Sequence, residues 1–223
     1  MNDKSHLRSK FCRFFINFSI LLIFIFGISN QAYSQRFGGG LKAGIVASEI
    51  SGDELAGPNK LGWFAGVFTN YPLSVNSLIQ LEIMYISKGS RAVPSKPLAR
   101  DYLLKLDYAE TTVLYKHKLE PFSSIDYIKK MTAEVGLSLG VLVDSYEVED
   151  DDRVIDVSDE RPFYGIEGSI WGGFLFPVYK NLSFNFRYSN SFTPARKHQS
   201  LQVVWYNWGQ YHSLWTLGLE YTF

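Results

Sequence analysis

The stretch Ile79-Gln80-Leu81-Glu82-Ile83-Met84-Tyr85-Ile86-Ser87-Lys88 decides the fold class. Its side chains alternate between an apolar set and a largely polar set. The apolar set is Ile79, Leu81, Ile83 and Tyr85, and the other set is Gln80, Glu82, Met84 and Lys88. A period of two residues is typical of a β-strand that buries or exposes one apolar face.

Seven further stretches show the same alternation, three of them clearly. The clear ones are 131–143, 182–189 and 215–223, and the weaker ones are 37–48, 61–71, 102–116 and 162–176. No apolar stripe with helical spacing and no apolar run of membrane-spanning length follows residue 35. The sequence therefore predicts about eight β-strands and no spanning helix.

The character of the two faces favours a membrane barrel over a soluble one. The polar faces combine Gly, Ser and Thr with Glu, Lys and Arg, which suits the narrow interior of an eight-stranded barrel. The apolar faces carry Tyr, Trp and Phe near the ends of the stretches, as an aromatic girdle does. We expect an all-β, closed, antiparallel, up-and-down transmembrane β-barrel in residues 35–223. A soluble lipocalin-like barrel with its apolar face inward is the alternative.

The N-terminus is typical of a secretory signal peptide. Four basic residues precede an apolar run from Phe14 to Ile28, and Ala32-Tyr33-Ser34 then offers small residues to a peptidase. The run is shorter than the roughly 20 residues that a spanning helix needs. We expect residues 1–34 to be cleaved, with a permanent membrane anchor as the alternative. Cys12 precedes the run, so we expect no lipoprotein.

Composition argues against several classes of function. The formal net charge is 0, so no electrostatic case exists for nucleic-acid binding. Cys12 is the only cysteine, which excludes a disulfide framework and a multi-cysteine metal site. No Gly-rich phosphate loop and no HExxH motif occurs, and we expect no cofactor.

The lengths of the connections indicate which end faces which compartment. Those at 72–76 and 177–181 are short, whereas those at 49–60, 89–101, 145–161 and 190–210 are long and polar. Outer-membrane barrels have short periplasmic turns and long outer loops, so we expect both termini in the periplasm. The 117–130 connection breaks the pattern by being long, and its Ser123-Ser124-Ile125-Asp126 can start one helical turn.

The last residues, Tyr221-Thr222-Phe223, resemble the β-signal that the barrel-assembly machinery reads, with Tyr221 and Phe223 as its aromatic positions. An ordinary last strand that ends in Phe is the alternative.

Several segments together resemble the PorT-like outer-membrane β-barrel proteins. They are Phe37-Gly38-Gly39-Gly40-Leu41-Lys42-Ala43-Gly44, Gly62-Trp63-Phe64-Ala65-Gly66-Val67-Phe68, an E-x-x-Y-x-x-K-G strand over 82–89, and Arg187-Tyr188. Thr111-Thr112 departs from the Ile-Pro that such barrels often carry. The resemblance spans essentially residues 36–223 and implies the barrel fold. The namesake serves a protein-secretion system, a role that fold resemblance does not carry over.

Nine charged residues fall on the faces that we expect to line the barrel interior. They are Lys42, Glu82, Lys88, Glu110, Lys116, Glu134, Glu167, Arg187 and Glu220. Unpaired buried charges are prohibitively costly, so these residues should pair with one another. We expect a structural plug of salt bridges, and a path for ions or protons is the alternative.

Two long loops are candidate binding sites. The 145–161 loop sets eight carboxylates against Arg153, which suits a divalent cation or a solvated surface, although its spacing matches no EF-hand. The carboxylates are Glu147, Glu149, Asp150, Asp151, Asp152, Asp156, Asp159 and Glu160. The 190–210 loop combines basic and aromatic residues, which suit lipopolysaccharide phosphates and acyl chains or simply a girdle and a loop. These are Arg196, Lys197, His198, Trp205, Tyr206 and Trp208. We expect a solvated acidic loop and a girdle.

A lipid A-modifying enzyme is the catalytic alternative. Its chemistry needs a serine activated by a histidine that an acid orients. His198 with Ser200 lies in a loop without an obvious acid, and His212 with Ser213 should face opposite sides of one strand. His117 lies on an expected turn. We therefore expect no enzyme.

These observations predict an outer-membrane barrel with a structural or interaction role in the cell envelope. Its expected partners are outer-membrane lipids and lipopolysaccharide, the barrel-assembly machinery at the C-terminus, and an envelope protein at the outer loops. A narrow transporter or channel is the alternative.

Overall fold

The computed structural model describes most of the chain from Phe37 to Phe223, which forms one compact unit. The described residues are 37–51, 57–92, 102–122, 125–149, 152–153, 163–197 and 209–223. The signal peptide expected at 1–34 lies outside them and stays a prediction. No helix among the described residues is long and apolar enough to cross a membrane.

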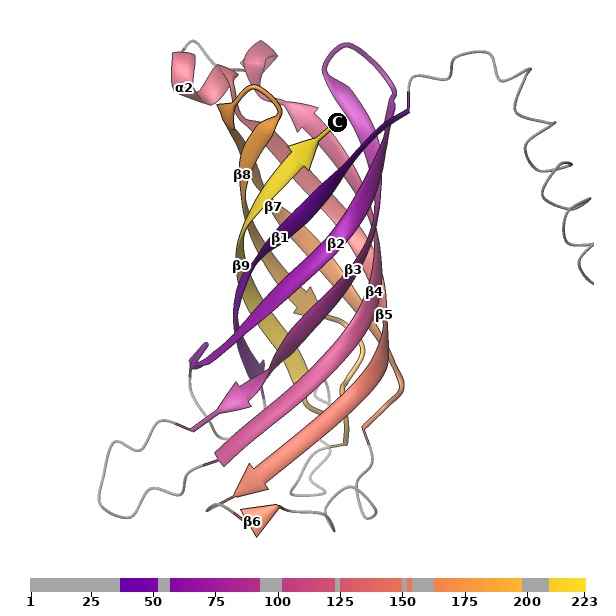
Figure 1. The fold of residues 1–223 in the computed structure, drawn as a ribbon, viewed down its shortest axis with the longest axis vertical. Helices are drawn as coiled ribbons and strands as arrows, with labels where there is room; N and C mark the ends of the chain where they lie inside the picture. Colours follow the sequence, from indigo (N-terminus) through magenta and orange to yellow (C-terminus); the bar gives the residue numbers. More distant parts are fainter. Residues whose placement is uncertain are drawn as a thin grey trace, which may run out of the picture. The chain divides into compact units, whose positions relative to one another are not determined.

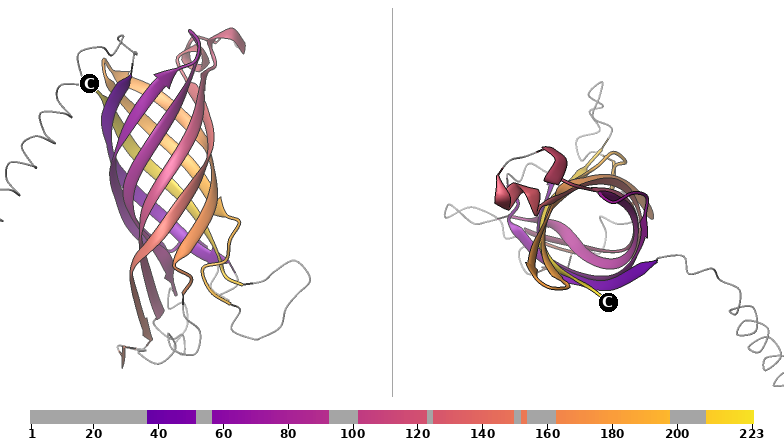
Figure 2. Two further views of the ribbon diagram at one scale, coloured as in Figure 1. Left: turned by 90° about the vertical axis from the view of Figure 1, so that its right-hand side faces the viewer. Right: turned by 90° about the horizontal axis from the view of Figure 1, so that it is seen from above.

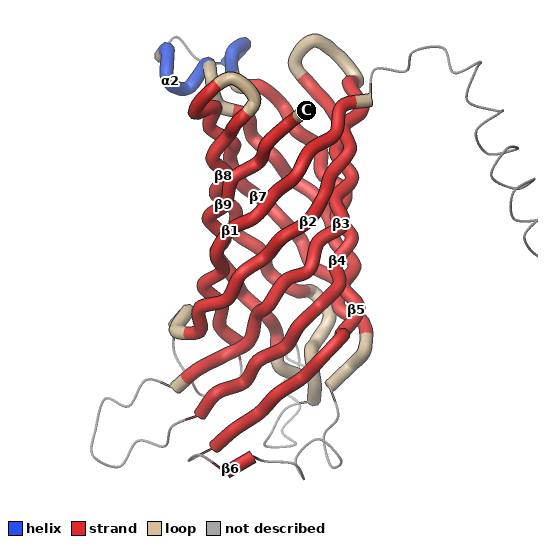
Figure 3. The backbone as a smooth tube through the Cα atoms, viewed as in Figure 1, coloured by secondary structure: helices blue, strands red, loops and turns tan. Residues whose placement is uncertain are grey.

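Strands make up nearly all of the described structure (Figure 3). They are β1 (Gly38–Ser51), β2 (Lys60–Pro72), β3 (Ser77–Arg91), β4 (Tyr102–Lys118), β5 (Thr132–Glu149), β6 (Asp152–Arg153), β7 (Ile166–Tyr179), β8 (Leu182–Ser191) and β9 (Tyr211–Thr222). Two short helical segments, η2 (Glu120–Phe122) and α2 (Asp126–Lys129), lie between β4 and β5.

The strands close into a barrel (Figure 2). Neighbouring strands pair antiparallel in the order β4-β3-β2-β1-β9-β8-β7-β5, and β4 also pairs with β5, which removes both edges. The two-residue β6 pairs only with the end of β5. Eight strands thus form the wall, which confirms the predicted fold class. Closure lets each strand satisfy its backbone groups within the wall, as a lipid environment requires.

The wall is inverted relative to a soluble protein. Ile83 and Leu137 face outward and are 57% and 58% exposed, whereas Glu82, the chain neighbour of Ile83, is 0% exposed. Apolar residues therefore cover the outside, and charged ones are buried inside. This arrangement fits a barrel surrounded by lipid and not a lipocalin-like one with an apolar interior.

The interior is not polar along its whole length, which differs from the sequence-based expectation. Val46, Ile50, Leu104, Leu106 and Leu214 are inward-facing and almost completely buried. They belong to the parts of β1, β4 and β9 near the long connections. On β1 both faces are apolar around Val46, and at the start of β4 the inward Leu104 and Leu106 are apolar whereas Lys105 and Asp107 between them are charged. The stretches 37–48 and 102–116 therefore do not keep one apolar and one polar face along their length.

The two ends of the barrel differ, as the connection lengths predict (Figure 1). The C-terminus, α2 and the short β2–β3 and β7–β8 turns lie at one end, and the long connections lie at the other. By the rule for outer-membrane barrels, the first is the periplasmic end and the second the outer end. The helical turn suggested near Ser123 is present as α2.

The predicted boundaries of two elements are wrong. The 145–161 connection does not begin at residue 145, because β5 continues to Glu149, and β7 begins at Ile166 instead of residue 162. β5 is longer than expected because β3, β4 and β5 extend farther at the outer end than the other strands (Figure 3). In that extension β5 stays paired with β4 up to Tyr102↔Glu149.

Inward-facing glycines allow adjacent strands to approach closely inside so narrow a barrel. A Cβ atom at Gly136 would lie 2.1 Å from the carbonyl oxygen of Val113 on β4. At Gly172 on β7, paired with Val135, a Cβ atom would meet nothing within 4 Å. Glycine is therefore required at position 136 because the curved wall brings β4 and β5 too close for a side chain there, and not because the chain must be flexible.

We expect Gly136→Val to prevent formation of the barrel or to lower its free energy of unfolding by several kcal/mol, as roughly 1–3 kcal/mol or more accompanies overpacking. The matched substitution Gly172→Val should be tolerated. Urea unfolding in detergent micelles, followed by tryptophan fluorescence, measures both. Equal unfolding midpoints for the two variants would contradict the packing described for Gly136.

Candidate functional site

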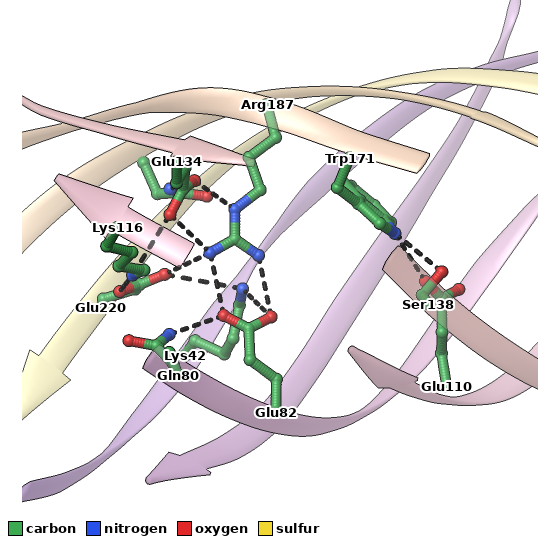
Figure 4. Close-up of polar contacts among 11 residues, drawn as sticks. Lys42, Gln80, Glu82, Glu110, Lys116, Glu134, Ser138, Trp171, Arg187 and Glu220 are labelled. Atoms are coloured by element: carbon green, nitrogen blue, oxygen red, sulfur yellow. Dashed lines mark hydrogen bonds and ion pairs between the residues drawn. The ribbon is translucent and has the colours of Figure 1, made fainter. Parts of the chain in front are cut away.

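Arg187 on β8 lies at the centre of a buried charge cluster (Figure 4). Its Nη1 and Nη2 atoms each donate to Glu82 on β3 at 2.8 Å, as a two-point pair. Nη2 also donates to Glu220 on β9 at 2.9 Å and to Glu134 on β5 at 3.0 Å, and Nε donates to Glu134. A guanidinium is suited to this task because it presents five donors in a rigid plane.

Two lysines complete this group, which we call the periplasmic cluster. Lys42 on β1 lies 2.8 Å from Glu82 and 3.6 Å from Glu220. Lys116 on β4 lies 2.8 Å from Glu220 and 3.2 Å from Glu134. The cluster comprises Lys42, Glu82, Lys116, Glu134, Arg187 and Glu220. Its charges balance, and its members come from six of the eight wall strands.

Neutral amides extend the periplasmic cluster. The side-chain amide of Gln80 donates to Glu82 at 2.6 Å, and that of Asn185 donates to Glu134 at 2.6 Å. Every carboxylate of the cluster therefore accepts bonds from more than one donor. Such saturation is what permits charges to remain buried.

A second group, the outer cluster, comprises Lys88, Glu110, Glu167 and His212. Lys88 lies 2.5 Å from Glu167 and 3.5 Å from Glu110, and Nδ1 of His212 lies 2.5 Å from Glu167. The ring of Tyr108 lies 4.4 Å from the Lys88 ammonium. Trp171 fills the space beside them and donates to both Glu110 and Ser138 at 2.9 Å.

The structure brings the nine charged residues singled out in the sequence into these two clusters. All are inward-facing and at most 4% exposed. The sequence reasoning missed His212, Trp171, Asn185 and Gln80 as partners. The alternation of inward and outward side chains could have identified His212, because it lies eight positions before the inward Glu220 on β9 and so points to the same side of the strand. The same alternation could also have placed Trp171 inside, because it lies four positions after the inward Glu167 on β7.

Arg196 is 2% exposed and bonded inside the outer end of the barrel, so it does not project from the 190–210 loop into a girdle or toward lipopolysaccharide as expected. It donates to both oxygens of Glu147 at 3.0 Å and to Gln210 at 2.6 Å. The ring of Phe163 lies 4.7 Å from its guanidinium. Burial opposes the charge, but the bonds to Glu147 outweigh it and raise the pKa of Arg196.

Glu147 likewise departs from the expected solvated acidic loop, because it lies on β5 and pairs with Arg196. Of the other loop carboxylates, residues 150–151 and 154–162 lie outside the described part of the chain, as do His198, Trp205, Tyr206 and Trp208. In the described residues, no three His, Cys, Asp or Glu side chains are grouped to hold a metal ion.

The residues of the proposed β-signal close the last strand. Tyr221 faces outward on β9, opposite Leu41 on β1, and Phe223 donates its backbone N–H to Gly39 at 2.9 Å. Their rings lie 5.9 Å apart and are exposed. Recognition by the assembly machinery stays a prediction.

Comparison with known protein families identifies the family of this chain. Residues 27–196 match the family described as outer membrane protein beta-barrel domain. The chain belongs to this family. The family and the closed apolar wall together establish an outer-membrane location, as the sequence predicted. Among curated proteins, none matches the sequence significantly.

Solved structures of small outer-membrane barrels resemble the chain weakly. Neisserial surface protein A is 10% identical, with a TM-score of 0.47, over 83% of this chain and 97% of that one. CarO of Acinetobacter baumannii is 9% identical, with a TM-score of 0.46, over 85% and 100%. Ail, the attachment invasion locus protein of Yersinia pestis, is 11% identical, with a TM-score of 0.42, over 84% and 99%.

We expect Arg187→Met to lower the free energy of unfolding by about 3–5 kcal/mol, since it leaves three buried glutamates with two lysines. Adding Glu134→Gln restores the balance of signs and should recover part of the loss. The exposed Lys180→Gln should change stability by no more than about 0.5 kcal/mol. Urea titration in the same micelles of the parent, Arg187→Met, Glu134→Gln, the double variant and Lys180→Gln gives the comparison, and additive single effects would argue against a shared cluster.

Proposed function

We propose that this protein is a non-conducting outer-membrane barrel with a structural and interaction role in the envelope. One observation supports this above all: the lumen is crossed by charge clusters whose members are bonded to one another. The periplasmic cluster contains three cations and three carboxylates within ion-pair distance. Displacing any of them to admit a solute would leave a buried charge unpaired.

The outer half supports the same proposal. On β4 the inward-facing Leu104 and Leu106 lie beyond Glu110 toward the outer end, and at that end Arg196 is bonded to Glu147. A hydrated path would have to pass these apolar side chains as well as both clusters. A narrow transporter or channel is therefore the less favoured alternative.

The placement of the histidines argues against a lipid A-modifying enzyme. His212 is completely buried and bonded to Glu167, whereas Ser213 is on the opposite face, bonded to Asn190. His117 is bonded to the hydroxyl of Tyr115 on the outer wall. His212 contacts a serine hydroxyl only through its backbone N–H, which donates to Ser191. In the described residues, no histidine ring is bonded to a serine hydroxyl as the chemistry of a nucleophilic serine requires.

The cellular process and the binding partners form the second part of this proposal. The PorT-like resemblance suggests a role accessory to protein secretion. The long connections at the outer end suggest an envelope partner there, and the apolar wall suggests contact with lipids and lipopolysaccharide. A deletion strain whose secreted proteins match those of the parent strain would exclude the secretion role while leaving the barrel itself untouched.

Conductance in planar lipid bilayers tests the central proposal. We expect the purified barrel to give no reproducible current steps, with a large general porin as positive control. The physical reason is the bonded lumen and not a lack of insertion. Insertion is therefore checked by flotation of the same preparation with liposomes. Reproducible channels of one conductance from inserted protein would overturn the proposal.

A further inference from the structure

The β4–β5 connection builds a pocket at the periplasmic end. It is the one connection there that is not a short turn, and it carries η2 and α2 (Figure 1). The pocket has a volume of about 670 Å³, within the usual range for small-ligand sites. Lys118, Glu120, Asp126, Lys129 and Lys130 line it on one side, and the barrel rim at Leu175 lines the other.

The pocket faces the mouth of the barrel and not the lipid. The rim residues Leu175 and Ser183 have the same inward parity as Arg187, and Ser183 lies two residues before Asn185 on β8. Asn185 is 1% exposed and bonded to Glu134, so the next inward position on β8 after Ser183 already belongs to the network of the periplasmic cluster. It is a blind depression open to the periplasm.

The charges of the pocket are largely unsatisfied by one another. The only ion pair among its described residues joins Lys129 to Asp126 at 3.7 Å, and both side chains are well exposed. Lys118 and Lys130 form no ion pair within 4 Å in this part of the chain. The pocket thus offers three ammonium groups and two carboxylates to a periplasmic ligand.

We propose that this pocket binds the stem peptide of the cell wall. That peptide carries carboxylates on three consecutive residues and one side-chain amine, which complements three lysines beside Glu120 and Asp126. Charge-assisted bonds of ammonium groups to carboxylates supply the attraction. The inference deepens the proposed interaction role by naming a partner, and it rests on that proposal only for assigning this end to the periplasm.

A phospholipid headgroup fits the same charges less well because of where the pocket opens. On the lipid-facing side of the connection lies Phe122, which is exposed. Its ring is 5.5 Å from the ring of His117, which points outward from the wall at the periplasmic end of β4. Phe122 therefore suits the membrane interface, while the lysines line the mouth. The β4–β5 connection therefore presents Phe122 to the lipid and its lysines to the mouth of the barrel.

Titration calorimetry of the full protein in detergent micelles tests the proposal. The probe is a purified disaccharide-tetrapeptide containing diaminopimelic acid. We expect measurable binding that weakens by roughly threefold to tenfold in Lys118→Gln/Lys130→Gln, since each exposed ion pair is worth well under about 1.4 kcal/mol. The control Lys180→Gln alters another lysine at the periplasmic end, outside the pocket, and should bind as the parent does.

Three results would overturn the proposal: no heat of binding, equal affinity in the double variant and the parent, or equal affinity for the tetrapeptide with its carboxylates amidated. Vesicles of phosphatidylethanolamine that compete with the tetrapeptide would assign the lysines to lipid instead. None of these outcomes bears on conductance, so failure here is distinguishable from failure of the non-conducting barrel.

Discussion

The interaction of Arg187 with three glutamates holds the periplasmic half of the barrel together. Its guanidinium bonds Glu82, Glu134 and Glu220, which come from three strands that are far apart in sequence. Lys42 and Lys116 then bridge pairs of the same glutamates. Because each carboxylate depends on more than one cation, the cluster resists loss of any single bond but not loss of its centre.

This centre follows from the constraint that lipid places on the wall. A strand in lipid must pair its backbone groups, so the sheet closes, and alternate side chains then point into a narrow interior. Outward positions are mostly apolar, which leaves inward positions on β1, β3, β4, β5, β7, β8 and β9 to carry the charged residues. Such an interior admits charges only as a balanced, bonded set.

The fold was largely predictable from the sequence because alternation is strongest where one face meets lipid and the other meets charge. Residues 79–88, 182–189 and 215–223 show this plainly. Val46 and Leu104 weaken the pattern because they are inward and apolar.

The inward positions of the nine charged residues followed from the alternation along each strand, but their division into two clusters depends on strand register. The burial of Arg196 depends on how its segment folds back, which no local pattern encodes. The pocket beneath α2 needed the three-dimensional placement of a connection that the sequence marked only as unusually long.

The most direct test of the closed, lipid-embedded barrel is its electrophoretic mobility before and after boiling. Outer-membrane fractions would be run on SDS gels with and without heating. The account predicts a band in the outer-membrane fraction that migrates faster unheated, because a closed barrel stays compact in detergent. A protein that is recovered in the soluble periplasmic fraction without a mobility shift would contradict it, since the exposed apolar wall would then have no lipid to face.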